Sequence, residues 1–171
     1  KTVAGDQERV AVLEPKIHSE LQGLLADAPV DVKIRQMAQE IAQELTKWIE
    51  DGTEGNKLEA AKRILKTYLN GSTELRLSGL ELTSLPECIG ELRNLRKLSL
   101  QYNRLSLLPE SIGKLGNLEV LYLSWNQLRE LPKGFGKLGK LEALVLNNNQ
   151  LSSLPEGFEE LGNLEALVLN N

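Results

Sequence analysis

The sequence contains a single cysteine and a single histidine among its 171 residues. Cys88 cannot form a disulfide within the chain, so we expect either a reducing compartment or a secreted protein that does not depend on disulfides. His18 has no second imidazole and no cysteine pair near it in the sequence, which argues against a metal site and a Ser-His-Asp arrangement. We therefore expect no cofactor, no metal ion and no catalytic site in this chain.

The sequence also lacks a long apolar run and an excess of positive charge. No stretch of about 18 apolar residues is present, so we expect no membrane-spanning helix, and the first residues do not resemble a signal peptide. The formal net charge is -4, with 20 Lys and Arg against 24 Asp and Glu. Nucleic acids and anionic membranes are bound mainly through clustered Lys and Arg, so neither is an expected partner.

What the sequence has in abundance is leucine at a fixed spacing. Leu75 and Leu98 are separated by 98 − 75 = 23 residues, and the same step leads on to Leu121, Leu144 and Leu167. Three further columns keep this step: Leu77, Leu100, Leu123, Leu146 and Leu169; Leu82, Leu105, Leu128 and Leu151; and Leu85, Leu108, Leu131 and Leu154, each of which precedes a proline. A period of 23 lies within the roughly 20–29 residues of a leucine-rich repeat.

The repeat predicts an α/β solenoid over residues 71–171, with about four and a half units. Leu98 and Leu100 are two residues apart, so on a strand they point to the same, interior side and the residues between them face solvent. We expect Asn103, Asn126 and Asn149 to satisfy backbone groups where the chain turns out of each strand. The proline after the later leucine favours a short extended or 3-10 segment on the convex side.

Upstream, the apolar period changes to that of helices, and residues 1–70 are expected to form a separate helical region. A first helix is predicted to begin at Pro15 and to end between Ala26 and Pro29. A second should run from Asp31 to Asp51 and stop at Gly52. A third should begin at Asn56, end at Asn70-Gly71 and cap the first repeat, because a terminal coil would otherwise expose its leucines.

The junction between helices and repeats resembles a known family. Trp48, the segment from Leu58 to Leu65 and the stretch from Thr73 to Pro86 are similar to the cap-to-repeat junction of bacterial leucine-rich-repeat effectors of the IpaH and YopM kind. The resemblance covers roughly residues 48–171. It implies a virulence protein that type III secretion delivers into a host cell, where the repeats bind host proteins and in some members present them to an attached ubiquitin ligase domain.

Two features depart from those effectors. The 23-residue unit with Leu-Pro-x-x-Ile-Gly-x-Leu, as in residues 108–115, resembles the repeats of Ras-associated proteins of plants and animals and of some other bacteria. The catalytic Cys-x-Asp of the ligase domain is not matched by Cys88-Ile89-Gly90. An enzyme, if there is one, would have to lie outside this chain.

The candidate contact surface is the exposed side of the strands, where parallel pairing aligns side chains in columns. Charge gathers near the helices and apolar character at the other end, and Tyr and Trp often dominate binding energy. The predicted partner-binding residues are Arg76, Lys97, Ser99, Tyr102, Val120, Tyr122, Trp125, Val145, Asn147, Asn148 and Val168. The alternative is that valine and alanine merely suit strands and that Trp125 packs locally over the sheet edge.

Other motifs have structural interpretations. Cys88 is expected to be partly exposed on the convex side rather than a nucleophile. Asn70-Gly71-Ser72 matches a glycosylation acceptor, but Asn-Gly after a helix is also a stop signal. Gly113-Lys114 lacks the other residues of a phosphate-binding loop.

Three function classes remain. The first is a protein-binding module, secreted into a host cell if it is an effector and cytoplasmic otherwise. The second is the substrate-recognition part of a larger enzyme such as a ubiquitin ligase, and the third is an architectural or adhesive protein of the bacterial surface. Leu167 and Leu169 follow the last strand pattern without the rest of a coil, which predicts further repeats, another domain or self-association through this end.

Overall fold

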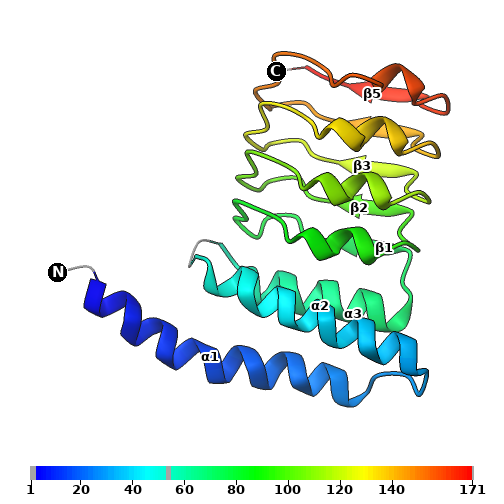
Figure 1. Ribbon diagram of the computed structural model, residues 1–171. Helices are drawn as coiled ribbons and strands as arrows, with labels where there is room; N and C mark the ends of the chain where they lie inside the picture. The colour runs from blue at the N-terminus through cyan, green and yellow to red at the C-terminus, as the bar shows by residue number, and fades with distance from the viewer. Residues whose placement is uncertain (1–2, 53–54, 171) are drawn as a thin grey trace.

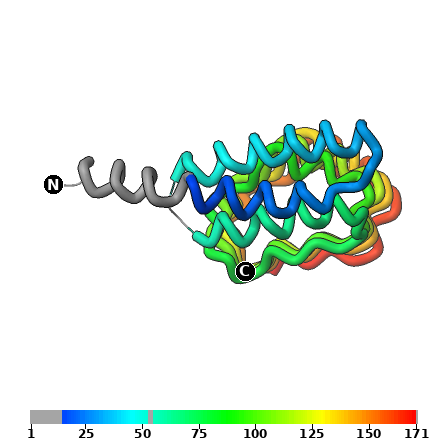
Figure 2. The backbone as a smooth tube through the Cα atoms, turned by 90° about the horizontal axis from the view of Figure 1, so that it is seen from below, coloured from blue at the N-terminus to red at the C-terminus, as the bar shows by residue number. Residues whose placement is uncertain are grey.

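The computed structural model describes residues 3–52 and 55–170. These residues form three helices, α1 (Val3–Ala26), α2 (Val32–Glu50) and α3 (Lys57–Asn70), which precede the repeats. Figure 1 shows the helices stacked against one end of the repeat array, with each coil placed on the one before it. Seen from the helical end, the coils share nearly the same outline behind the helices (Figure 2).

Helix α1 begins earlier than its sequence pattern indicates. The prediction of a start at Pro15 is wrong, because Pro15 lies inside α1. Proline has a backbone φ that suits a helix. Inside a helix it removes one backbone donor and crowds the preceding turn, so an interior proline is unfavourable but still possible. Ile17 and Leu21 of this helix are buried against the other two helices, while His18 is exposed.

Helices α2 and α3 begin at the predicted caps. The Asp31 carboxylate accepts hydrogen bonds from the backbone N–H groups of Lys33 and Ile34 at 2.9 and 3.1 Å, and the Asn56 side chain accepts one from Glu59 at 3.3 Å. Helix α3 ends at Gly71, which has the left-handed φ of 64° that glycine adopts readily. Helix α2 is capped by Asp51, one residue before the predicted stop.

Five short strands form one parallel sheet in sequence order. They are β1 (Glu74–Arg76), β2 (Lys97–Ser99), β3 (Val120–Tyr122), β4 (Ala143–Val145) and β5 (Ala166–Val168). Each pairing joins equivalent residues of neighbouring repeats, such as Leu75 with Leu98 and Leu98 with Leu121. The strand leucines of the first four coils are at most 2% exposed, which confirms the predicted interior side.

The convex side carries the predicted 3-10 segments. They are η1 (Glu87–Glu91), η2 (Glu110–Lys114), η3 (Lys133–Lys137) and η4 (Phe158–Glu160). Extended prolines precede the first three, and Pro155 precedes the turn that leads to the fourth. The confirmed architecture is therefore a leucine-rich-repeat solenoid with three helices at its N-terminal end.

A buried asparagine ladder holds the turns after the strands. Asn126 donates to the carbonyl oxygens of Leu100 and Leu123 at 2.9 and 3.1 Å and accepts from the backbone N–H of Leu105 at 3.0 Å. Asn103 and Asn149 repeat this pattern in the neighbouring coils. The predicted structural role of the asparagines is confirmed, because each links backbone groups of two adjacent coils.

Two helices, rather than α3 alone, cover the first coil. Helix α3 packs beside β1, and α2 packs against η1. The Trp48 indole N–H donates to the Ser84 hydroxyl at 3.0 Å, and a Glu44 carboxylate oxygen accepts from the backbone N–H of Cys88. The hydrophobic core is accordingly continuous from the helices into the repeats.

This packing corrects the expectation for Cys88. Its side chain is 6% exposed instead of partly accessible, because α2 lies over the convex segment that carries it. Burial raises the pKa of the thiol far above its usual range, and the nearby Glu44 carboxylate adds to this effect. Cys88 therefore stays a neutral core thiol and not a nucleophile.

Candidate binding surface on the strand face

The surface of interest is formed by four columns of side chains beside the buried strand leucines, here called the strand face. Its columns are Glu74, Lys97, Val120, Ala143 and Ala166; Arg76, Ser99, Tyr122, Val145 and Val168; Ser78, Gln101, Ser124, Asn147 and Asn170; and Gly79, Tyr102, Trp125 and Asn148. Among the predicted contact residues, Arg76, Tyr102, Trp125 and Val168 are exposed. Half-buried on the same face are Lys97, Val120, Tyr122, Val145, Asn147 and Asn148.

Ser99 departs from the expectation that it faces solvent. It is 5% exposed although it belongs to the strand face. Its partners in the register are Arg76 on β1 and Tyr122 on β3, and these longer side chains flank the short serine. Ser99 therefore offers little contact surface.

Tyr102 and Trp125 form an exposed aromatic pair in successive coils. Their ring centroids are 6.1 Å apart with planes 14° from parallel. The two residues are 61% and 51% exposed, so stacking leaves much of both rings in contact with water. A partly wetted Tyr–Trp pair of this kind is a frequent centre of protein binding surfaces.

The backbone beneath the aromatic pair is strained. Tyr102 and Trp125 have φ of 59° and 58°, in the left-handed region. Equivalent positions in the first and fourth coils hold Gly79 and Asn148, residue types that adopt this region more easily. For a bulky side chain the conformation costs about 1–2 kcal/mol per residue. Two coils thus accept backbone strain where glycine or asparagine would relieve it.

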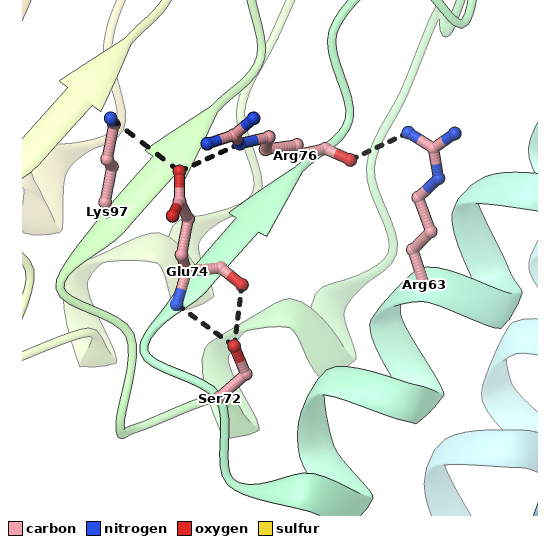
Figure 3. A network of polar contacts seen from close by, with 5 residues as sticks. All are labelled: Arg63, Ser72, Glu74, Arg76 and Lys97. Atoms are coloured by element: carbon pink, nitrogen blue, oxygen red, sulfur yellow. Dashed lines mark hydrogen bonds and ion pairs between the residues drawn. The ribbon is translucent and has the colours of Figure 1, made fainter.

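A small polar network lies at the helical end of the strand face (Figure 3). The Arg76 Nε donates to Glu74 Oε1 at 2.9 Å, and the Lys97 Nζ lies 3.7 Å from the same oxygen. Arg63 of α3 donates to the Arg76 carbonyl oxygen at 3.0 Å. The hydrogen bond from Arg76 is the main reason that the pKa of Glu74 is lowered, so this carboxylate is ionised at neutral pH.

Lys97 connects this network to the aromatic residues. Its Nζ lies 5.6 Å from the centroid of the Tyr122 ring, within the range of a cation–π contact. The sequence-based residue list contains Arg76, Lys97 and Tyr122 but not Glu74 or Arg63. A signal for Glu74 was available, since it pairs with Lys97 in the predicted register, whereas the reach of Arg63 depends on how α3 docks.

An acidic column borders the strand face on one side. Glu119, Glu142 and Glu165 each come directly before a strand, and the sequence-based list does not include them. Arg96 Nη2 lies 2.7 Å from Glu119 Oε1 and compensates that carboxylate. The two outer glutamates are exposed, so the border is most acidic toward the C-terminal coils.

Other kinds of site find no support in the described part of the chain. Within residues 3–52 and 55–170, no three His, Cys, Asp or Glu side chains are grouped so that they could hold a metal ion. None of the helices in those residues is long and apolar enough to span a bilayer.

The family match agrees with this architecture. A model described as a leucine-rich repeat region matches residues 73–171, which is more than half of the chain. The chain belongs to the leucine-rich-repeat family. Such regions generally serve as protein-interaction modules and are typically non-catalytic. The search of curated proteins gives no match.

Solved leucine-rich-repeat structures include relatives of the expected kind. A leucine-rich-repeat protein of Leptospira interrogans is 46% identical, with a TM-score of 0.54, covering 54% of this chain and 24% of its own. The repeat domain of a Shigella effector is 32% identical, with a TM-score of 0.60, covering 68% and 50%. YopM from Yersinia enterocolitica is 25% identical, with a TM-score of 0.54, covering 77% and 32%.

These matches qualify the resemblance to effectors. The similarity to a Shigella effector domain and to YopM is found, and it extends to a leucine-rich-repeat protein from a further bacterium. The chain spans between about a quarter and a half of the length of these proteins. What they share with this leucine-rich-repeat chain is the fold of the repeats.

Proposed function

We propose that this chain binds a partner protein through its strand face, with Tyr102, Tyr122 and Trp125 at the centre of the contact. The observation that carries the proposal is the stacked, half-exposed pair of Tyr102 and Trp125 on left-handed backbone. Strain that is retained at an exposed position points to a role outside folding. Aromatic side chains bring large contact areas with little loss of side-chain freedom, which suits a binding centre.

The remaining predicted residues surround that centre. Val120 and Val145 neighbour Tyr122 in the sheet and supply aliphatic surface. Asn147 and Asn148 supply amide groups beside them, as expected for the polar rim of an interface. Val168 continues the aliphatic column on β5.

The test compares partner capture by three forms of the chain. The double variant Tyr122→Ala/Trp125→Ala should lose at least about tenfold in affinity for a captured partner, because hot-spot truncations cost about 2 kcal/mol or more. The double variant Lys133→Ala/Lys137→Ala, on the convex side, is the matched control and should bind as the parent does. Circular dichroism establishes that each variant is folded. Unchanged capture by the folded aromatic variant would reject the strand face as the binding surface.

We further propose that the partner is a host protein and that the chain acts as a bacterial effector delivered into the host cell. The structural likeness to a Shigella effector domain and to YopM supports this assignment. A pull-down with equal amounts of animal-cell and bacterial lysate should yield a partner that depends on Tyr122 and Trp125 only from the animal cells. Such a partner from the bacterial lysate alone would favour a cytoplasmic role in the bacterium.

The alternative is that the chain is the substrate-recognition part of a larger enzyme such as a ubiquitin ligase. Its match to only half of the Shigella effector domain is compatible with that role. The sequence of the parent gene beyond residue 171 discriminates the two. A ligase domain with its catalytic cysteine would establish the alternative, and a stop codon would remove it.

A further inference from the structure

We propose that the strand face takes an extended partner segment whose carboxylate binds at Arg76 and Lys97 and whose bulky apolar side chain, about three residues away, packs against Tyr122 and Trp125. This inference rests on the proposed function and specifies the chemistry of the partner. It also gives the segment a direction, with its acidic end toward the helices.

The charge distribution of the strand face indicates that the partner group at its helical end is anionic. The charged residues in its four described columns are Glu74, Arg76 and Lys97, all at the helical end. Both cations approach one carboxylate oxygen, Glu74 Oε1. One positive charge is therefore uncompensated on a surface that is otherwise uncharged, and an anionic partner group would balance it.

The exposed Arg76 guanidinium is the group to which we assign the partner's carboxylate. Arg76 engages Glu74 through Nε, and its side chain is 70% exposed. The hydrogen bond to Glu74 uses Nε, whereas the two terminal nitrogens of an arginine form the edge that binds a carboxylate with two parallel hydrogen bonds. Lys97 lies on the neighbouring strand, with its Nζ 5.6 Å from the centroid of the Tyr122 ring.

The register of the sheet sets the spacing of the motif. Arg76, Ser99 and Tyr122 are equivalent residues on three consecutive strands. Strands lie about 4.8 Å apart, so Arg76 and Tyr122 are separated by about 10 Å along the stack. An extended chain advances about 3.3 Å per residue, so about three residues span this distance. Ser99 between them is buried, so we expect the segment to contact the longer side chains of Arg76 and Tyr122 and not Ser99.

The acidic border fixes the direction. A segment running the opposite way would bring its carboxylate toward the C-terminal coils, where Glu142 and Glu165 are exposed. Like charges at that end would repel it, whereas Arg96 compensates Glu119 nearer the middle. Only the orientation with the acidic end at Arg76 places opposite charges together.

The experiment selects peptides from a displayed library of random 12-residue sequences on the whole chain. We expect enriched sequences to carry Asp or Glu about three residues from Leu, Phe or Trp. Synthetic peptides of the enriched type are then titrated by fluorescence anisotropy against Arg76→Ala/Lys97→Ala, Tyr122→Ala/Trp125→Ala and the convex control Lys133→Ala/Lys137→Ala. The first two variants should lose about tenfold or more in affinity, and the control, which removes the same charge, should lose none.

The outcomes separate this inference from the proposed function. The difference in affinity between the parent and the Arg76→Ala/Lys97→Ala variant should become smaller at high salt, because salt screens ionic contacts. Such a decrease supports an ionic contact. Peptides that need Tyr122 and Trp125 but ignore Arg76 and Lys97, or that are enriched in Lys and Arg, overturn the acidic motif and leave the strand face as the binding surface. Peptides that bind independently of both pairs overturn both proposals. Failure to enrich any sequence overturns the extended segment, while partner capture still decides the proposed function.

Discussion

Single residues of this chain differ in whether they stabilise the fold or present surface to solvent, and the neighbours Trp125 and Asn126 show the contrast. The Asn126 amide is buried and makes three hydrogen bonds to backbone groups of two coils. Trp125 is 51% exposed, and its ring stacks with that of Tyr102 in the preceding coil. The asparagine stabilises the turn, whereas the tryptophan strains it and presents a ring to solvent.

The replacement Trp125→Asn should change stability little and binding strongly. It installs the residue type that Asn148 provides at the same place in the next coil. Relief of about 1–2 kcal/mol of backbone strain offsets the loss of about 0.5–1.5 kcal/mol of ring stacking. Urea unfolding should give a free energy within about 1 kcal/mol of the parent, while partner capture falls.

Asn126→Ala is the comparison for that variant. It leaves buried backbone groups without partners and should lower the free energy of unfolding by about 2–3 kcal/mol. If Trp125→Asn destabilised the chain as much as Asn126→Ala, the tryptophan would be a structural residue and the strain argument would fail.

At the scale of elements, glycine stands at one equivalent position of η1, η2 and η3, where each convex segment packs closely against the next. A Cβ on Gly113 would lie 2.6 Å from the carbonyl oxygen of Gly134 in the next segment. We expect Gly113→Ala to lower the free energy of unfolding by about 1–3 kcal/mol, as overpacking typically does. Gly116→Ala is the matched control, since a Cβ there meets no atom within 4 Å. Equal midpoints in urea for the two variants would contradict this account.

The periodic elements were predictable and the contacts between distant elements were not. The 23-residue period determines which leucines face inward, and the proline and asparagine that recur with it predict the 3-10 segments and the asparagine ladder. The continuation of α1 through Pro15 could not be deduced locally, because a proline at a helix start and one inside a helix share the same φ. The burial of Cys88 depends on where α2 docks. Likewise, the left-handed backbone at Tyr102 was not predicted, because the residue type does not favour it. Gly79 at the equivalent position of the first coil was an indication of it in that column.

At the scale of the whole molecule, the two ends of the stack differ in how they are closed. At the N-terminal end, α2 and α3 cover the first coil, and Leu75 and Leu77 are buried. At the other end, the equivalent Leu167 and Leu169 are 39% and 41% exposed. The same side chain at the same place in the repeat is thus interior or solvent-facing according to its neighbour. The sequence predicted this asymmetry, because each repeat needs an adjacent element to bury its leucines.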